Sequence, residues 1–283
     1  MRSSDIGGDY VMDPVPEVVP EITLVEDDRF PLTIPHSPIV PVREIPQELQ
    51  AYHGSDLEAE MIEKIDVLNG GFVRLVDWMG DDLSIVRSAR VSYDADWREG
   101  DEQKDAKLIA YLMKNRHTSP FESVSFSFEV KAPIFVFRQW HRHRTWAYNE
   151  ISARYTELDE GYYIPELDQI TTQSASNKQM RTNEQHPMAA NLQRIIESQC
   201  NASFEQYRGL IRQGCPRELA RSVLPVAAYS RMFATVNLHN LFHFLRLRLH
   251  EHSQYEIRVY AEAMLQLIEP IVPVATQAFK NTL

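Results

Sequence analysis

The stretch SVSFSFEVKAPIFVFRQWHRHRTWAYNEISARY, residues 123–155, changes its pattern twice. Residues 123–131 alternate apolar and polar side chains, which predicts a half-buried strand. Residues 132–137, APIFVF, read as buried, and Pro133 suits the first turn of a helix. Residues 138–155 then carry four arginines, with Glu150 as the only acidic counter-charge. We therefore expect a strand and a helix that bring fixed cations to the wall of a cleft.

The cations in this stretch are interleaved with aromatic and amide side chains. A guanidinium group is planar and permanently charged, and it can hold a phosphate or a planar imide with two parallel hydrogen bonds. An arginine-rich run is more often a solvated helix end with ordinary surface charges. The neighbouring aromatic, amide and hydroxyl groups favour a bound nucleotide over that alternative; the residues of the run are Arg138, Trp140, His141, Arg142, His143, Arg144, Trp146, Tyr148, Asn149, Ser152 and Arg154.

Composition limits the classes of function. The chain has 283 residues, a formal net charge of -11 and 43% apolar residues, which is ordinary for a globular protein of one or two domains. The acidic balance disfavours a sequence-independent nucleic-acid binder, which needs a broad basic surface. Cys200 and Cys215 have no zinc-type spacing, and no run approaches the roughly 20 apolar residues of a membrane span. We expect a cytoplasmic protein without a nucleic-acid or membrane partner.

The first 60 residues differ from the rest of the chain. They are rich in proline and acidic residues, and the prolines interrupt every possible helix. We interpret residues 1–60 as an N-terminal extension and residues 61–283 as a single catalytic domain. A short amphipathic helix is expected at residues 55–64, where Ser55 can cap it.

Outside these segments, helical and strand patterns occur in mixed order. Strands are expected at 72–79 and 230–236, and a polar, mobile loop is expected at 171–185. Helices are expected at 82–91 with Asp82 as the cap, at 101–115, at 187–213, at 217–224, at 238–249 and at 255–279, the last interrupted near Pro270 and Pro273. This order predicts an α+β fold with helices around an antiparallel-type sheet.

Residues 238–252, LHNLFHFLRLRLHEH, combine an apolar helix with ionisable groups. His239 and His243 are one turn apart, which allows a metal pair, but HExxH and a third ligand are missing, so we expect no metal site. Arg246 and Arg248 lie on different faces, so one of them can point inward, where it needs a partner such as a ligand.

Two further polar residues stand alone in sequence. Ser119 lies in a turn with His117 and Glu122, where it can donate to a phosphate or stabilise the turn itself. Arg221 follows a short helix, where an arginine is more often a surface or salt-bridging residue.

A short motif, its longer form and several further segments of the sequence resemble those of the flavin-dependent thymidylate synthases. Arg142-His143-Arg144, seven residues and then Ser152 are similar to the signature of that family, and Asn149, Glu150 and Arg154 fall within its longer motif. Ala147 stands where this motif usually has serine. Segments 71–94, 117–140 and 220–237 also resemble family segments in the right order, so the resemblance extends from about Lys64 to the C-terminus.

The resemblance implies an activity, its cofactors and its site residues. Members convert dUMP to dTMP with methylenetetrahydrofolate as the one-carbon donor and FAD, reduced by NADPH, as the hydride source. Their sites are shared between subunits of a homotetramer. It implies a dUMP-binding set of Gln139, Trp140, His141, Arg142, Glu150, Ile151, Ser152, Ala153, Arg154, Arg221 and Arg248. It implies an FAD-binding set of Ser92, Ser119, Arg142, His143, Arg144, Glu150, Asn237, Leu238, His239 and His243, although His243 stands where asparagine is expected.

Arg248 is the expected catalytic residue. A guanidinium against the pyrimidine edge favours negative charge on N3 and the carbonyl oxygens, and so raises the electron density at C5 without a cysteine nucleophile. One alternative is a nucleotide-binding module without turnover, which Ala147 and His243 favour. Another is a single-stranded RNA binder that uses arginines and aromatic rings, which the net charge disfavours.

Overall fold

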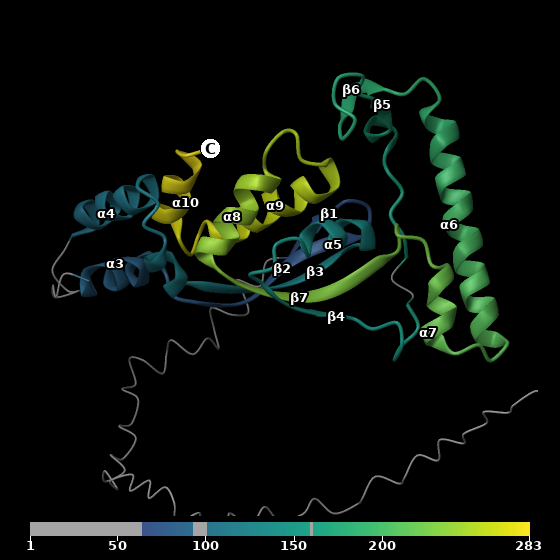
Figure 1. Cartoon of the computed structure of the whole chain (residues 1–283), viewed down its shortest axis with the longest axis horizontal. Coiled ribbons are helices and arrows are strands. Elements are labelled where there is room, and N and C mark those ends of the chain that lie inside the picture. Colours follow the sequence, from purple (N-terminus) through teal and green to yellow (C-terminus); the bar gives the residue numbers. More distant parts are fainter. Residues whose placement is uncertain (1–63, 93–100, 159–160) are drawn as a thin grey trace, which may run out of the picture. The chain divides into compact units, whose positions relative to one another are not determined.

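The computed structural model describes residues 64–92, 101–158 and 161–283 (Figure 1). These residues belong to one compact unit, residues 54–283. The expected extension, residues 1–60, lies outside the described residues. So does the helix expected at 55–64, apart from Lys64, which instead begins a strand.

A five-stranded antiparallel sheet forms the centre of this unit. Its strand order is β1 (Lys64–Val67), β2 (Gly71–Met79), β3 (Ser125–Pro133), β7 (Tyr229–Asn237) and β4 (Ala147–Glu150). β3 is the middle strand, where Phe128 pairs with Leu75 on one side and Ala234 on the other. The sheet confirms the predicted α+β class, whereas β1 and β4 were not expected from the sequence.

Helices and 3-10 turns connect and cover the strands (Figure 1). They are α3 (Asp82–Val91), α4 (Glu102–Lys114), η1 (Ser119–Ser123), α5 (Ile134–Trp140), η2 (Leu167–Gln169), α6 (Ala189–Arg212), α7 (Arg217–Ala220), η3 (Arg221–Val223), α8 (Leu238–Arg248), α9 (Tyr255–Ile268) and α10 (Pro273–Lys280). The expected helices are confirmed with small shifts at their ends. The exception is the helix expected at 217–224, which is a single short turn followed by η3.

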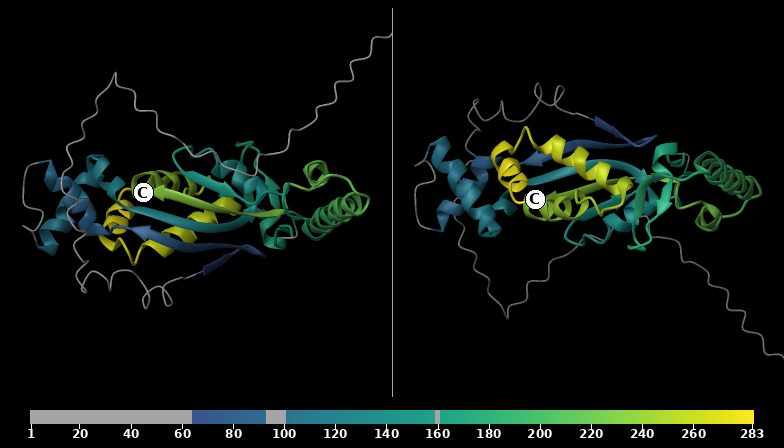
Figure 2. Two further views of the ribbon diagram at one scale, coloured as in Figure 1. Left: turned by 90° about the horizontal axis from the view of Figure 1, so that it is seen from below. Right: turned by 90° about the horizontal axis from the view of Figure 1, so that it is seen from above.

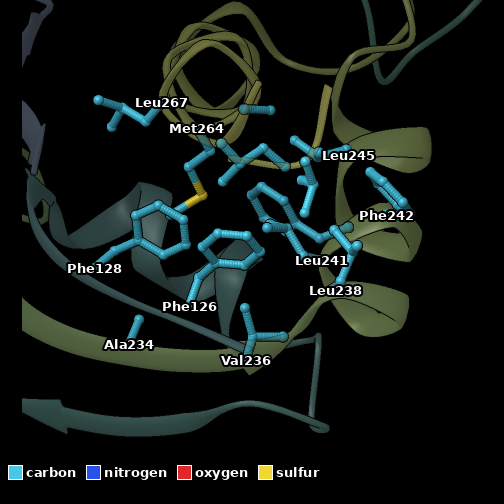
Figure 3. Packing of buried hydrophobic residues seen from close by; sticks show 14 of the residues in the cluster. Phe126, Phe128, Ala234, Val236, Leu238, Leu241, Phe242, Leu245, Met264 and Leu267 are labelled. Atoms are coloured by element: carbon cyan, nitrogen blue, oxygen red, sulfur yellow. The ribbon is translucent and has the colours of Figure 1, made fainter. Parts of the chain in front are cut away.

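The core lies between the sheet and helices α8 and α9 (Figures 2 and 3). The alternation in β3 places Phe126 and Phe128, both fully buried, on the covered face, where they meet Met264 of α9 and Leu241 of α8. Burying a side chain of this size contributes about 2 to 3 kcal/mol. The opposite face carries exposed residues of β7, including Phe233.

The polar segment 171–185 is not an irregular loop as predicted. It forms a two-stranded antiparallel hairpin of β5 (Thr171–Gln173) and β6 (Arg181–Gln185). The hydroxyls of Thr172 and Thr182 hydrogen-bond across it at 2.6 Å, and the side-chain amide of Gln173 closes the turn by donating to the carbonyl of Met180 at 2.7 Å. Cross-strand polar pairs of this kind stabilise a hairpin but leave no apolar alternation in the sequence.

The predicted cap of α3 is displaced by one residue. Asp81, not Asp82, is the N-cap, and it exchanges hydrogen bonds with Ser84 in a capping box. The carboxylate of Asp82 instead accepts from the backbone amides of Val274 and Ala275, at 2.8 and 2.9 Å, and so caps α10. This long-range contact joins α3 to α10.

Candidate active site

An aromatic cluster supports the turn between α5 and β4. Trp140, the last residue of α5, is fully buried and stacks on Phe244 of α8 with 4.8 Å between ring centroids. Trp146 packs against the same ring at 5.2 Å. The Tyr148 hydroxyl donates to the backbone carbonyl of His143 at 2.8 Å. The turn that carries the predicted cations is therefore anchored to the core.

Three of the predicted site residues meet directly at the end of α8. Arg248 donates from Nε to Nε2 of His143 at 3.1 Å and from Nη2 to the backbone carbonyl of Gln139 at 3.1 Å. The inward arginine expected on this helix is therefore Arg248. Arg246 instead donates to the backbone oxygen and hydroxyl of Thr282.

His143 is a neutral partner for this arginine. Its side chain is buried, and desolvation together with the positive charge of Arg248 and the nearby His243 lowers its pKa to about 4. At neutral pH the imidazole therefore carries one proton, which must lie on Nδ1 because Nε2 accepts from Arg248. Desolvation also lowers the pKa of Arg248, but a guanidinium remains charged at physiological pH.

The other arginines of the central stretch form an exposed cationic surface. Arg138, Arg142 and Arg144 are exposed, and none of them is paired with a carboxylate of the described residues. Arg154 lies over the ring of Tyr155 and donates from Nε to the hydroxyl of Ser152 at 3.3 Å. These groups provide free donors for an anion.

Glu150 lies at the end of β4, beside a small cleft. Its carboxylate accepts from the hydroxyl of Ser230 at 2.7 Å. The cleft has a volume of about 300 Å³ and is lined by Glu129, Asn149, Glu150, Ile151, Arg231, Met232 and Phe233. Among the predicted site residues, Glu150 and Ile151 therefore share one opening, which residues of β3, β7 and β4 line.

The remaining predicted residues are spread over the structure. Asn237 caps α8 by accepting from the backbone amide of Asn240 at 2.9 Å, and Ser119 begins η1, which packs against both α3 and α8. His243 faces His143, with 5.9 Å between ring centroids. The others are Ser92 at the end of α3, His141 beside Tyr148, His239 on α8, Ala153 after β4, and Leu238, whose side chain is fully buried.

Arg221 lies apart from the other predicted nucleotide ligands. It begins η3, next to α6 and α7, and its Nε donates to the backbone carbonyl of Glu218 at 3.3 Å. Within the described residues, no hydrogen bond or ion pair connects Arg221 with Arg248. The structure therefore brings Gln139, His143, His243 and Arg248 together and does not join Arg221 to them.

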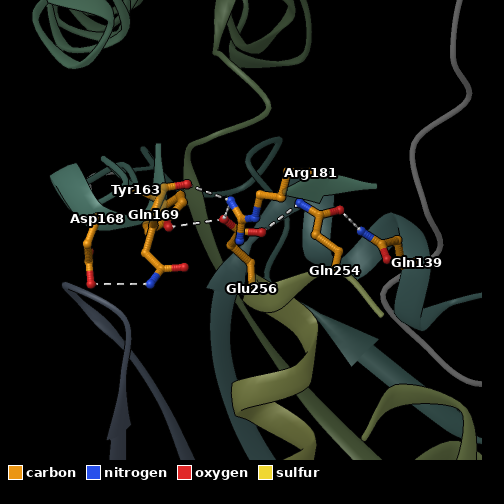
Figure 4. Close-up of polar contacts among 7 residues, drawn as sticks. All are labelled: Gln139, Tyr163, Asp168, Gln169, Arg181, Gln254 and Glu256. Atoms are coloured by element: carbon orange, nitrogen blue, oxygen red, sulfur yellow. Dashed lines mark hydrogen bonds and ion pairs between the residues drawn. The ribbon is translucent and has the colours of Figure 1, made fainter. Parts of the chain in front are cut away.

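A network of polar side chains that includes Gln139 was not predicted from the sequence (Figure 4). It joins Gln139 to Gln254, Glu256 and Arg181 of the β5–β6 hairpin. Gln139 and Gln254 are 115 positions apart in the sequence, and Arg181 and Glu256 are 75 positions apart, so no local spacing could reveal the network. The signal that sequence does offer is a glutamate, Glu256, at a buried position of the amphipathic helix α9.

Neither cysteine is disulfide-bonded, and burial raises the pKa of the Cys200 thiol. A thiol with a raised pKa is a poor nucleophile at neutral pH. None of the described helices combines the length and apolar character that a membrane crossing requires.

Known proteins resemble the chain in sequence and in structure. The sequence pattern of the family described as thymidylate synthase complementing protein matches residues 74–274. The flavin-dependent thymidylate synthase of Treponema denticola is 47% identical over 225 residues, which cover 78% of this chain and 83% of that protein. The flavin-dependent thymidylate synthase of Thermus thermophilus is 48% identical over 225 residues, with coverages of 77% and 79%.

A solved structure has the same fold. The crystal structure of the UMP/dUMP methylase PolB from Streptomyces cacaoi, bound with 5-Br dUMP, matches with a TM-score of 0.70 and 37% identity. The match covers 77% of this chain and 97% of that chain.

The antiparallel sheet gives an α+β fold, Arg248 and the exposed arginines of residues 138–154 form a site suited to an anionic ligand, and the matched proteins make the chain an enzyme of this fold. The chain belongs to the family of the flavin-dependent thymidylate synthases, as the sequence resemblance predicted.

Proposed function

We propose that this protein methylates dUMP at C5 to give dTMP, with methylenetetrahydrofolate as the one-carbon donor. The observation that carries the proposal is the Arg248 guanidinium, which is held by the neutral His143 and by the Gln139 carbonyl. The same stretch of chain as His143 carries exposed arginines that are paired with no carboxylate of the described residues. In the overall reaction the C5 hydrogen leaves as a proton, and the folate supplies the carbon. The bound flavin, reduced by NADPH, would supply the hydride.

Arg248 would activate the uracil electrostatically. A guanidinium has five N–H groups, and two of them are used by His143 and by the Gln139 carbonyl, so three remain for a ligand. Placed against N3 and a carbonyl oxygen of the base, these groups stabilise negative charge there and make C5 more nucleophilic. Arginine keeps its own proton, so it acts as a fixed charge and not as a base.

The neutral state of His143 matters for this role. A carboxylate in its place would form an ion pair and offset much of the arginine's charge. Neutral imidazole orients the guanidinium through one hydrogen bond but leaves its charge available to the nucleotide. His143 is therefore a residue that orients the proposed catalytic residue.

The residues predicted to hold FAD fit an anionic, partly aromatic ligand. Arg142 and Arg144 are exposed cations without a carboxylate partner in the described part of the chain, and Ser119 is an exposed hydroxyl. We propose that these residues bind the flavin's phosphates and that Asn237, His239 and His243 on α8 contribute polar contacts. Sites shared between the subunits of a homotetramer would explain why Arg221 lies apart from Arg248.

Both cysteines would be dispensable in this mechanism. The raised pKa of Cys200 supports activation of the base without covalent attack by a thiol. We place the enzyme in the cytoplasm, where it would have no membrane or nucleic-acid partner.

The experiment that tests the proposal is product analysis by mass spectrometry. The purified protein is supplied with FAD, NADPH, methylenetetrahydrofolate and dUMP, and each component is omitted in turn. We expect dTMP only in the complete mixture, and a folded protein that binds FAD but forms no dTMP would contradict the proposal. It would instead support a nucleotide-binding module without turnover.

UMP provides a second substrate to test. The structurally similar PolB is described as a UMP/dUMP methylase and was also crystallised with 5-Br UMP, whereas the similar proteins from Treponema and Thermus are thymidylate synthases. We expect a preference for dUMP because identity to the latter group is higher. A kcat/KM for UMP equal to or above that for dUMP would assign the protein to the other specificity.

A further inference from the structure

A continuous chain of side chains links the β5–β6 hairpin to Gln139 (Figure 4). Arg181 of β6 donates to Oε1 of Glu256 at 3.2 Å, and Gln254 donates from Nε2 to Oε2 of the same carboxylate at 2.8 Å. Gln139 donates from Nε2 to Oε1 of Gln254 at 2.5 Å. The backbone carbonyl of Gln139 is the group that accepts from Arg248.

Glu256 is the fixed acceptor of this chain. It is 3% exposed, and a buried carboxylate is stable only when it is paired and hydrogen-bonded. Its Oε1 accepts from Arg181 and from the hydroxyl of Tyr163, both at 3.2 Å. Burial and the nearby charge of Glu256 raise the pKa of Tyr163, so the phenol remains a donor. Oε2 is left for Gln254.

This arrangement determines which way each amide points. An ionised carboxylate can only accept, so Gln254 must turn its NH₂ group to Glu256 and its oxygen to Gln139. Gln139 must then turn its own NH₂ group to Gln254. Its Oε1 takes no part in the chain, and no described residue donates to that oxygen.

We propose that Glu256 and Gln254 are positioning residues that fix the amide of Gln139 with its oxygen presented to a donor of the bound nucleotide. The proposal rests on the nucleotide chemistry proposed above and extends it to specificity. It assigns Gln139 the part of an acceptor, which complements the donors of Arg248. Arg181 connects the hairpin to the same carboxylate, so the hairpin helps to keep Glu256 in place.

The first test is Glu256→Gln, which keeps the shape and removes the charge. Arg181 and Tyr163 both donate to the same side of residue 256, so the new amide must keep its oxygen there and turn its NH₂ group to Gln254. Gln254 and Gln139 must then both reverse, which presents an NH₂ group to the nucleotide. We expect the dUMP dissociation constant, measured by isothermal titration calorimetry, to rise about tenfold.

The second test restores the direction of the hydrogen bond from Gln139 to residue 254 without restoring the ion pair between Arg181 and residue 256. In the double variant Glu256→Gln with Gln254→Glu, residue 254 can only accept, so Gln139 again donates to it and presents its oxygen outward. We expect dUMP affinity to return to within about threefold of the wild type, although Arg181 still lacks its carboxylate. A purely structural role of the Arg181–Glu256 ion pair predicts that the double variant binds as weakly as the single variant.

Two further variants serve as controls. Glu269→Gln makes the same substitution just beyond α9, in a partly buried ion pair with Lys280, and should leave dUMP affinity unchanged. Gln254→Met breaks the chain but keeps the ion pair between Arg181 and the buried Glu256, so it should weaken dUMP binding several-fold with little change in the unfolding temperature. The variant Gln254→Met still tests the positioning role if Glu256→Gln fails to fold.

The outcomes separate this proposal from the function on which it rests. Wild-type protein that binds no dUMP would overturn the proposed function. Wild-type protein that binds dUMP, with unchanged affinity in Glu256→Gln or in Gln254→Met, would overturn the positioning role alone. A double variant that binds dUMP as weakly as Glu256→Gln would also overturn the positioning role. The full pattern of loss and recovery would establish it.

Discussion

For single residues, the proposed reaction depends most on the charge and the orientation of Arg248. The variant Arg248→Ala should fold and take up flavin, but its kcat should fall about 10²- to 10³-fold, because the guanidinium would stabilise charge that develops on the base. Arg246→Ala is the matched control, since Arg246 lies on the same helix and contacts Thr282 instead. A kcat near that of the wild type for Arg248→Ala would contradict the assigned role.

His143 gives a second prediction at this scale, for the pH dependence of stability. Its folded-state pKa of about 4 lies below the ordinary value of 6.5, so the unfolded chain binds more protons between these values. The free energy of unfolding should therefore decrease as the pH falls from about 6.5 to about 4.

Chemical denaturation across that range checks this prediction for His143. His143→Gln lacks the titrating group, so its stability should depend less steeply on pH in the same window. An equal slope in both proteins would contradict the lowered pKa.

The residues of the Arg248 site show what sequence can reveal. Arg142, His143, Ser152 and Arg248 were predicted because they lie in motifs or at helical spacings. Glu256 and Arg181 were missed, because their ion pair depends on the β5–β6 hairpin, which has no apolar alternation in the sequence.

At the scale of elements, the β1–β2 hairpin approaches α9 very closely at Gly71. A Cβ atom there would lie 2.0 Å from the Tyr260 hydroxyl, 2.7 Å from the Lys131 carbonyl and 2.9 Å from the Val67 carbonyl. The Tyr260 hydroxyl also donates to that Lys131 carbonyl at 2.8 Å. Gly71→Ala should therefore destabilise the fold by about 1 to 3 kcal/mol, as overpacking typically does.

Gly209 provides the control for this substitution. It lies inside α6, where an added Cβ would meet nothing closer than 3.9 Å. Gly209→Ala should stabilise the protein by about 0.5 to 1 kcal/mol, because alanine favours the helix. Thermal unfolding of both variants tests these two predictions. A midpoint temperature for Gly71→Ala equal to that of the wild type would contradict the close packing.

The helices and strands with a clear hydrophobic periodicity were the ones that the sequence predicted. β3 and α8 were predicted well, because burial on one face leaves a period of two or of 3.6 residues. β4 and the β5–β6 hairpin were missed, because β4 pairs with a single neighbour at the sheet edge and the hairpin is held largely by polar contacts. The capping role of Asp82 toward α10 joins positions 192 residues apart and leaves no local signal.

At the scale of the whole molecule, the expected assembly is a homotetramer with shared sites. Light scattering coupled to gel filtration should give four times the chain mass of 32.8 kDa. Arg221 should affect dUMP binding in the assembly although it has no contact with Arg248 within one described chain. A monomer with full activity would contradict the shared site.

The proposed activation of the uracil by Arg248 can be measured as release of tritium from dUMP labelled at C5. Each of FAD, methylenetetrahydrofolate and NADPH is omitted in turn. We expect release by the wild type only when flavin and folate are both present, and little release by a folded, flavin-loaded Arg248→Ala variant. Equal release by the two proteins, or none from flavin-loaded wild type, would contradict activation of the uracil by Arg248.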